Sequence, residues 1–147
     1  MPRVITTVDL ADLAELDVWP TLVNFERYPD LMEDVVRVQV LERSETSMVS
    51  SWEVLLNGSQ FTWTERDTLT APRLIEFEQI DGDLEVWKGK WELLRDGDNL
   101  SAALTVDFDI GIPSLSEILD PIGERAIRAN CRQMLDAIRQ HASEPAE

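Results

Sequence analysis

Six consecutive segments with a two-residue hydrophobic period, followed by one long segment with a helical period, constrain the fold of this chain most. The six segments span 35–42, 47–56, 61–69, 73–80, 84–94 and 101–110. Turns such as Asn57-Gly58 and Asp81-Gly82 join them, and turns of this kind predict hairpins of antiparallel strands. Strand side chains alternate between the two faces of a sheet, so the apolar face of this sheet has to be covered.

The remaining segments supply that cover. Residues 3–10 predict a further strand, 14–25 and 29–32 predict two short helices, and the amphipathic final stretch predicts a long helix. We therefore expect an α+β fold: a curved seven-stranded antiparallel sheet around a long C-terminal helix, with two short helices after the first strand. We expect one domain over 1–142 and a disordered tail over 143–147, because a chain of 147 residues suits one domain.

The charge balance narrows the set of partners. Thirteen Lys and Arg against 29 Asp and Glu give a formal net charge of −16, and such a surface repels phosphate backbones and anionic headgroups. We therefore expect no nucleic acid and no membrane as partners. No run approaches the roughly 20 apolar residues of a membrane span, and the first residues lack the apolar stretch of a signal peptide, so we expect a cytoplasmic protein.

The scarcity of His and Cys narrows the chemistry. His141 is the single histidine and lies near the end of the sequence, and Cys131 is the single cysteine. A multi-histidine metal site and a disulfide framework are therefore excluded, and a nucleophile–His–Asp triad lacks a well-placed histidine. The sequence has no GxGxxG, Walker loop or CxxC. We expect no cofactor and no metal, which leaves carboxylates, amides, hydroxyls and tryptophans to carry any chemistry.

The segment 61–69 holds the strongest candidates for such chemistry. Its two-residue period groups five side chains on one face: Phe61, Trp63, Glu65, Asp67 and Leu69. Aromatic side chains favour the face toward the helix, so the two carboxylates would point inward, where an uncompensated charge in a filled core is strongly destabilising. A cavity with water or a polar ligand removes that conflict, and mutual repulsion would raise the pKa of one carboxyl, as a general acid requires. The alternative is a strand end at which both acids face water.

Aromatic side chains elsewhere are placed to line the same cavity. On the neighbouring hairpin, Trp87 and Trp91 share a face with Gly89 between them, a gap that suits a flat aromatic ligand unless these rings are ordinary core. We expect the Tyr28 hydroxyl either to lie at the mouth of the cavity or to be exposed in a turn. We expect Trp52 to lie in the core. Each of these positions therefore has both a functional and a structural interpretation.

The final helix places a polar side chain in its apolar stripe. At about 100° per residue, Asn130 falls among apolar residues that include Met134. A buried amide without partners costs about 1–3 kcal/mol, so Asn130 has to bond to the sheet, to water or to a ligand. The opposite face carries four arginines, which form either a solvated stripe or a docking surface for an acidic carrier protein: Arg125, Arg128, Arg132 and Arg139.

Four stretches of the sequence resemble the START/Bet v 1-like polyketide cyclase/dehydrase superfamily: 18–32 (VWPTLVNFERYPDLM), 61–65 (FTWTE), 88–92 (KGKWE) and 128–130 (RAN). The likeness spans essentially the whole chain and is closest to single-domain aromatase/cyclases of bacterial aromatic polyketide pathways. The resemblance implies the helix-grip fold, in which a sheet wraps around a C-terminal helix and encloses a cavity. It also implies that a poly-β-ketone, tethered to acyl carrier protein, is folded there for aldol closure and dehydration.

The resemblance also assigns positions in this sequence. It implies that four side chains line the cavity: Trp63, Trp91, Tyr28 and Asn130. Such aromatases often carry a Ser and an Arg two and four residues after the strand tryptophan, where this chain has Glu65 and Asp67. A cationic clamp for an enolate oxygen is therefore missing at that place, which bears on the regiochemistry of ring closure.

We therefore expect a polyketide aromatase/cyclase that works in an internal cavity. Among the catalytic candidates, Glu65 and Asp67 divide the base and acid roles, directly or through water. The other two, Asn130 and Tyr28, donate to carbonyl oxygens. The substrate-binding candidates hold the chain in a bend: Trp63, Trp91, Trp87, Phe61 and Met134. A non-catalytic carrier of a quinone, lipid or other hydrophobic aromatic ligand is the alternative, and a partner-binding regulator with a collapsed cavity is another. Monomer and homodimer both stay open.

Overall fold

The computed structural model describes residues 3–10, 13–56, 59–109 and 116–142, and it confirms the α+β architecture expected from the sequence. Its elements follow in chain order: β1 (Arg3–Asp9), α1 (Glu15–Val23), a 3-10 turn (Phe25–Arg27), α2 (Tyr28–Leu31), β2 (Val35–Arg43), β3 (Ser47–Leu56), β4 (Ser59–Thr70), β5 (Leu74–Gly82), β6 (Val86–Asp96), β7 (Asn99–Asp109) and α3 (Ser116–Ala142). The expected turn at Asn57-Gly58 and the expected tail over 143–147 lie outside the described residues.

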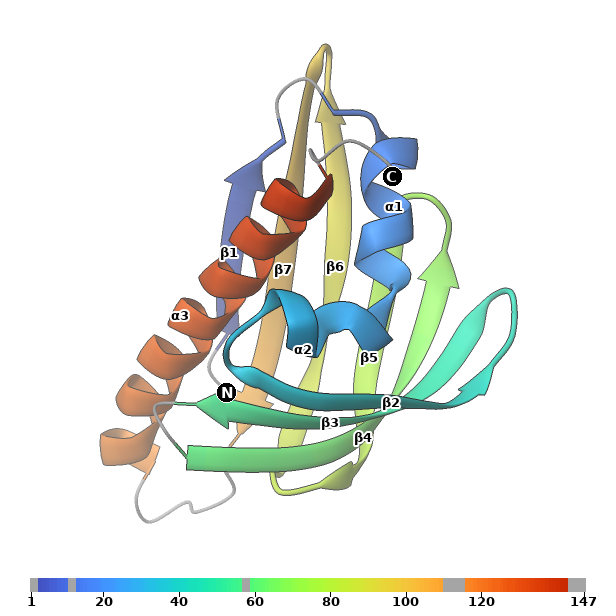
Figure 1. Cartoon of the computed structure of the whole chain (residues 1–147). Helices are drawn as coiled ribbons and strands as arrows, with labels where there is room; N and C mark the ends of the chain where they lie inside the picture. The colour runs from blue at the N-terminus through green and yellow to red at the C-terminus, as the bar shows by residue number, and fades with distance from the viewer. Residues whose placement is uncertain (1–2, 11–12, 57–58, 110–115, 143–147) are drawn as a thin grey trace.

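The described strands form one antiparallel sheet of seven, in the order β1-β7-β6-β5-β4-β3-β2. Strands β2 to β7 follow one another as a meander, and β1 returns to pair with β7. In Figure 1, β2, β3 and β4 run across the direction of β6 and β7, so the sheet is strongly bent. The bend gives the sheet a concave face, which is the face that holds the core.

Gly89 allows β6 to lie close to its neighbours in the sheet. A Cβ atom at Gly89 would lie 1.9 Å from the backbone oxygen of Thr105 and 2.9 Å from Cζ of Phe77. No side chain fits at such distances, so this position requires glycine. The gap that the sequence indicated between Trp87 and Trp91 is therefore occupied by a neighbouring strand and by the Phe77 ring.

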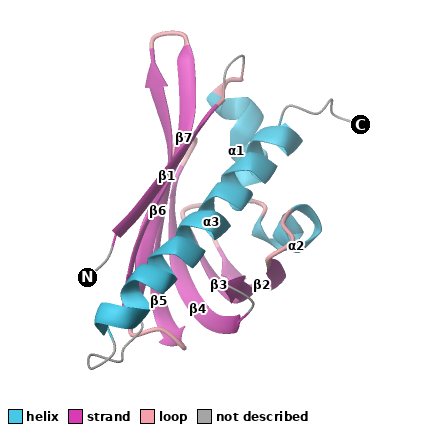
Figure 2. Ribbon diagram, turned by 90° about the vertical axis from the view of Figure 1, so that its left-hand side faces the viewer, coloured by secondary structure: helices cyan, strands magenta, loops and turns pink. Residues whose placement is uncertain are grey.

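The helices cover the concave face of the sheet. Figure 2 shows α3 running diagonally across the sheet, with α1 and α2 on the same side of it. The buried side chains described on α3 recur at helical spacing and confirm the expected apolar stripe: Ile127, Asn130, Cys131, Met134, Leu135 and Ile138. The α3 helix packs against β1 and α1, and the core lies between these helices and the sheet.

Two arginines of α3 contact the edge of the sheet, where β1 has a partner strand on one side. Arg128 Nη1 donates to the backbone oxygen of Ile5 at 3.3 Å, and Arg132 Nη1 donates to that of Thr7 at 2.8 Å. Free carbonyls on an edge strand are a template for unwanted pairing, and these guanidinium groups occupy them. Part of the arginine stripe therefore protects the edge of β1.

Candidate functional site

The inward face of β4 carries Trp63, Glu65 and Asp67, as the two-residue period predicted. Their exposed fractions are 5%, 2% and 0%, so both carboxyls are buried. Strand β4 pairs with β3 on one side and with β5 on the other, which places the two acids inside the sheet and away from its edges. The alternative in which both acids face bulk water is therefore wrong.

A cavity of about 30 Å³ lies between this part of the sheet and α3. Its lining residues come from β3 to β7 and from α3: Trp52, Val54, Trp63, Glu65, Phe77, Trp87, Trp91, Leu104, Val106, Asn130, Cys131 and Met134. This volume admits a water molecule or two, whereas pockets for drug-sized ligands hold about 300–1,000 Å³. The cavity expected between the sheet and the final helix is therefore present in the described part of the structure, but its volume is too small for a polyketide.

Hydrogen bonds from two indoles reach the carboxyl pair. Trp63 Nε1 donates to Glu65 Oε1 at 2.7 Å. Trp52 Nε1 donates to Ser50 Oγ at 2.9 Å, and Ser50 Oγ donates to Asp67 Oδ2 at 2.6 Å. The register of β3 and β4 makes this possible, because it sets Ser50 opposite Glu65. One carboxyl is thereby held by an indole and the other by a hydroxyl.

Burial and mutual proximity shift the protonation of both acids. Burial raises the pKa of Glu65 well above its usual range, and the neighbouring Asp67 carboxyl raises it further. Burial also raises the pKa of Asp67, but its interactions with Glu65 and Ser50 oppose that rise. Glu65 therefore keeps its proton to higher pH than an ordinary glutamate, and Asp67 is the member of the pair that ionises more easily.

Among the buried polar atoms that have no hydrogen-bond partner in the described residues, two belong to side chains that the sequence singled out. The first is Asn130 Nδ2, on a side chain that is 5% exposed and lines the cavity. The second is Asp67 Oδ1. Buried donors and acceptors are rarely left unpaired, because each costs about 1–3 kcal/mol. Asn130 is therefore a donor available to water or a ligand in the cavity.

The structure brings together most of the side chains that the sequence singled out. Six of the nine line the cavity: Glu65, Asn130, Trp63, Trp91, Trp87 and Met134. Asp67 lies behind Glu65 and is outside the lining, with an exposed fraction of 0%. Phe61 is half-buried at the margin of the core and is also outside the lining. Of the two acids, Glu65 is therefore the one that meets the cavity.

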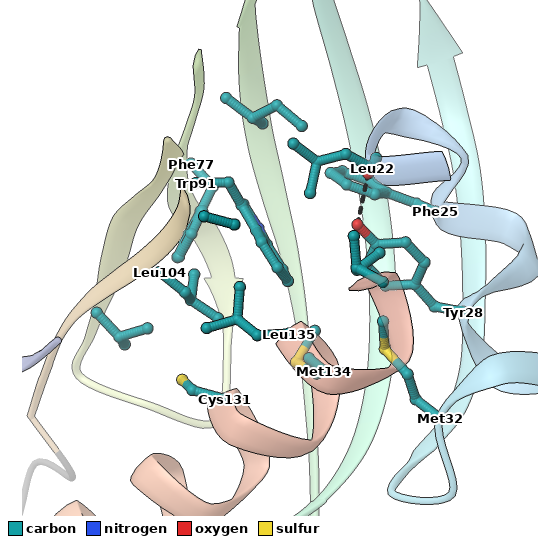
Figure 3. Packing of buried hydrophobic residues seen from close by; sticks show 14 of the residues in the cluster. Leu22, Phe25, Tyr28, Met32, Phe77, Trp91, Leu104, Cys131, Met134 and Leu135 are labelled. Atoms are coloured by element: carbon teal, nitrogen blue, oxygen red, sulfur yellow. Dashed lines mark hydrogen bonds between the residues drawn. The ribbon is translucent and has the colours of Figure 1, made fainter. Parts of the chain in front are cut away.

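The position of Tyr28 differs from the expectation. Its side chain is fully buried where α2 begins, and its hydroxyl donates to the backbone oxygen of Leu22 near the end of α1. Figure 3 shows this bond, with the hydroxyl directed toward Leu22. Neither expected location, over a cavity mouth or exposed in a turn, is correct, because the hydroxyl serves to join α2 to α1.

Sequence reasoning missed several residues of the site. Ser50 was not singled out, and Trp52 was assigned to the core although it also lines the cavity. Both lie on the inward face of β3, so the two-residue period contains a signal for them. Phe77 follows from the same period on β5, and Cys131 lies beside Asn130 in the stripe of α3. No local pattern, however, brings Ser50 to a particular partner on β4.

The four indoles around the cavity form two different walls. Trp52 and Trp63 stack with ring planes 7° apart, and each is tied by a hydrogen bond. The indole N–H groups of Trp87 and Trp91 make no hydrogen bond within the described ranges. The rings of Trp87 and Trp91 contact those of Trp63 and Tyr28, at centroid distances of 4.7 and 6.0 Å respectively. One wall is thus fixed by polar contacts, and the other is held by packing alone.

The outer face of the sheet carries a larger, open hollow of about 430 Å³. A row of alternating charges crosses it from β1 to β4: Arg3, Asp107, Lys88, Glu78 and Arg66. Nε of Arg3 lies 2.7 Å from Oδ1 of Asp107, and the other neighbours in the row stand opposite one another in the register. Paired charges of both signs produce little net field, so we place the candidate site on the inner face.

Within the described ranges, no three His, Cys, Asp or Glu side chains gather closely enough to hold a metal ion. None of the described helices combines the length and the apolar character that crossing a membrane requires.

A protein-family model described as polyketide cyclase/dehydrase and lipid transport matches residues 14–135 of the chain. Among curated proteins, the actinorhodin polyketide synthase bifunctional cyclase/dehydratase of Streptomyces coelicolor is 33% identical over 111 residues. That match covers 70% of this chain and 35% of the relative, so the chain spans about a third of the length of that protein.

Solved structures share the fold over nearly the whole chain. The Zhui aromatase/cyclase of Streptomyces sp. R1128 has a TM-score of 0.83 at 23% identity, with 96% of this chain and 93% of that one covered. A protein of Thermus thermophilus has a TM-score of 0.87 at 18% identity, with 96% and 97% covered. A STAR-related lipid transfer protein of Xanthomonas axonopodis has 0.74 at 18% identity, with 97% and 86% covered. These likenesses establish a START/Bet v 1-like fold and leave the activity to be argued from the site.

Proposed function

The chain belongs to the polyketide cyclase/dehydrase and lipid transport family, and from that premise we propose that it is a polyketide aromatase/cyclase. In this proposal the protein binds a poly-β-ketone between the sheet and α3 and promotes regiospecific aldol closure followed by dehydration. The family relationship supports cyclase or dehydrase chemistry and lipid binding alike. The choice between them therefore depends on the side chains of the site.

The observation that carries the proposal is a buried carboxyl on the cavity wall. Glu65 is 2% exposed, lines the cavity and has a raised pKa. Burying two acids without a cation among the described lining residues destabilises a fold, and ligand storage alone gives no reason for it. A carboxyl with a raised pKa is a stronger base when ionised, and it can hold the proton that it takes and return it as an acid.

In the aldol step, the Glu65 carboxylate takes a proton from a carbon that lies between two carbonyl groups. The electron pair of that C–H bond forms an enolate, and the enolate carbon attacks a second carbonyl carbon to form the ring bond. Glu65 then returns its proton to the oxygen of the attacked carbonyl, so no net proton is consumed. Asp67 stays behind Glu65, and its negative charge makes Glu65 a stronger base.

In the dehydration step, the same carboxylate takes a proton from the carbon next to the new hydroxyl. The electron pair of that C–H bond forms a double bond as the hydroxyl departs, and Glu65 gives the proton to it, so that it leaves as water. One carboxyl therefore alternates between base and acid. This revises the division of roles between Glu65 and Asp67 expected from the sequence, because Asp67 is not among the lining residues.

Other side chains of the cavity position the substrate in this proposal. Asn130 Nδ2, which has no partner in the described structure, donates to the enolate or carbonyl oxygen. The faces of Trp63 and Trp91 hold the chain in a ring-forming bend, where proximity supplies much of the rate. Tyr28 is left out of the machinery, because its hydroxyl is already bonded to Leu22.

A poly-β-ketone needs far more room than about 30 Å³, so binding has to displace part of the wall. We assign that displacement to Trp87, Trp91 and Met134. The two indoles have no hydrogen bond to lose within the described structure, and methionine adapts its shape easily. Trp52 and Trp63 stay in place, because moving them would break the bonds to the carboxyl pair.

A carrier of a quinone, lipid or other hydrophobic aromatic ligand is the second candidate. The cavity lining favours it, since ten of the twelve described lining residues are aromatic, aliphatic or sulfur-containing. The two functions differ in the fate of the ligand, because a carrier returns it chemically unaltered. The enzyme proposal includes delivery of the substrate by acyl carrier protein, with Arg125 and Arg139 of α3 as exposed cations for an acidic partner.

The experiment that separates the candidates adds the purified protein to a minimal polyketide synthase and follows the aromatic products by mass spectrometry. We expect the wild type to change the product. Glu65→Gln should give the products of the synthase alone and still show quenching of tryptophan fluorescence by planar polyphenols. Unchanged products together with tight binding of an unaltered ligand would establish the carrier. A protein that neither changes the products nor shows quenching would instead be a partner-binding regulator.

A further inference from the structure

We propose that Ser50 is a positioning residue that holds the negative charge of the carboxyl pair on Asp67 and so leaves the proton on Glu65, at the cavity wall. The inference deepens the proposed function, because it makes Glu65 the stronger base of the pair. It rests on that function for its activity readout, whereas the position of the proton is measurable in the free protein.

The direction of the Ser50 hydrogen follows from its two partners. An indole N–H is a donor only, so Trp52 Nε1, 2.9 Å away, uses a lone pair of Ser50 Oγ. The other neighbour, Asp67 Oδ2, is 2.6 Å away and accepts the single hydroxyl hydrogen. Ser50 is 0% exposed, so bulk water offers no competing acceptor. The hydroxyl is therefore locked as a donor to Asp67.

Each carboxyl of the pair accepts one side-chain hydrogen bond, and the two donors differ in kind. The contact from Ser50 has the length of a hydroxyl bond to an ionised carboxylate, about 2.5–2.7 Å. Glu65 Oε1 accepts the indole N–H of Trp63 at 2.7 Å, and a protonated carboxyl accepts such a bond through its carbonyl oxygen. The negative charge is therefore favoured on Asp67, and the proton is favoured on Glu65.

Other titratable groups near the pair stay neutral in the range where it titrates. From α2, Tyr28 has a pKa raised well above its ordinary value by burial. From α3, burial raises the pKa of Cys131 to about 12. From β5, the residue opposite Glu65 is Gln79, which does not titrate. Changes of protonation at the site between mildly acidic and mildly basic pH therefore belong to Glu65 and Asp67.

The test follows the side-chain carboxyl carbons of Glu65 and Asp67 by carbon-13 NMR across pH in the free protein. In the wild type we expect Asp67 to titrate at lower pH than Glu65. In Ser50→Ala we expect the Asp67 step to move up by about one pKa unit, because a charge-assisted hydrogen bond is lost. Ser51→Ala is the matched control, because Ser51 faces the other side of the same strand, opposite Thr64, and it should leave both steps unchanged.

Ser50→Cys is the second variant, in case Ser50→Ala does not fold. Its S–H group is a weak donor of similar shape, so the Asp67 step should move up by less than in Ser50→Ala. The proposal is overturned when Glu65 titrates before Asp67 in the wild type. It is also overturned when the Asp67 step does not move in a folded Ser50 variant.

The pH profile of kcat/KM gives a readout that structural damage would not imitate. Without the hydrogen bond from Ser50 to Asp67, Glu65 carries the negative charge in a larger share of the molecules in which one carboxyl of the pair is ionised. That share rises about tenfold for each unit by which the pKa of Asp67 rises. Relative to its own maximum, Ser50→Ala should therefore be up to about tenfold more active than the wild type on the acid side, whereas a damaged fold loses activity at every pH. If the Asp67 step moves in Ser50→Ala but the wild type cyclises no polyketide, the role of Ser50 stands and the proposed function is overturned. If the protein cyclises polyketides but the Asp67 step does not move in a Ser50 variant, the proposed function stands and the role of Ser50 is overturned.

Discussion

The two faces of the sheet hold their acidic side chains in opposite ways. On the outer face, Asp107 and Glu78 stand between cations in a row of alternating sign. On the inner face, Glu65 and Asp67 are buried, and no cation is among the described residues that line the cavity. The outer acids are explained by their neighbours. The inner acids have no such neighbours, and the proposed function gives a reason for their burial.

This difference shows which property of an acid indicates function. Opposite charges across neighbouring strands stabilise a sheet by about 0.2–1 kcal/mol a pair, so the outer row has a structural purpose. A buried acid without a counter-charge works against the fold, and proteins keep such groups where activity needs them. The missing counter-charge is therefore the signal, and the acidic composition of the chain is not.

The largest difference between the faces is expected in activity. Glu65→Gln removes the proton-transferring group but keeps an oxygen that accepts from Trp63 Nε1, so the fold should persist while the cyclisation rate falls about 100-fold or more. Glu78→Gln, on the outer face, should leave the rate unchanged. Single-turnover rates with synthase-made substrate measure both variants. If Glu65→Gln and Glu78→Gln lowered the cyclisation rate equally, the inner acid would have no special role in the reaction.

The next largest effect is expected in the pH dependence of stability. Burial raises the pKa of Glu65 and Asp67, so above the ordinary Glu value of 4.5 the folded protein binds more protons than the unfolded chain. The free energy of unfolding should therefore fall as pH rises through that window, by up to about 1.4 kcal/mol per pH unit for one proton. Urea unfolding at a series of pH values measures this slope.

Glu65→Gln is the control for that slope, because it removes the group whose pKa is raised most strongly. Most of the fall in stability with rising pH should disappear in this variant, and the variant should be the more stable protein at the alkaline end. A slope that persists unchanged would mean that the inner pair is not what destabilises the fold as pH rises.

The inner face could be predicted from the sequence because alternation is a property of the local backbone. The two-residue period of 61–69 predicts that Glu65 and Asp67 face inward, and the helical period of the last segment predicts that Asn130 is buried; the structure confirms both. The hydrogen bond from Ser50 to Asp67 could not be predicted from the sequence. The two residues are 17 positions apart and meet through the register of β3 against β4, which no local pattern fixes.

Two further features depend on tertiary packing, so they could not be predicted from the sequence either. The hydroxyl of Tyr28 bonds to Leu22 because α1 ends beside α2, and no spacing in the sequence encodes that distance. The volume of the cavity depends on how the rings of several strands and the side chains of α3 fill one space together. A pattern of inward residues therefore predicts the lining of a cavity better than its size.

A smaller effect is expected from reversing one charge of the outer row. Lys88→Glu would place a negative charge between Asp107 and Glu78, and like charges across strands should lower the free energy of unfolding by about 0.2–1 kcal/mol. Urea unfolding in low and high salt measures this loss, which salt should screen because Lys88 and Glu78 are exposed. A loss that survives molar salt would show that Lys88 supports the fold through packing.

The smallest effect is expected at Asp107, and its sign is the opposite of that at the inner pair. The Arg3 guanidinium holds the pKa of Asp107 below its ordinary value of 3.8, so in acid the unfolded chain binds more protons than the folded protein. The stability from this pair is present above that value and is lost as pH falls through the lowered pKa. Asp107→Asn should therefore lose slightly less stability than the wild type on strong acidification, as acid titration of urea unfolding would measure. Because Arg3 is exposed, water and salt reduce the effect, so a loss as steep as that at Glu65 would contradict the view that outer acids are weakly coupled to the fold.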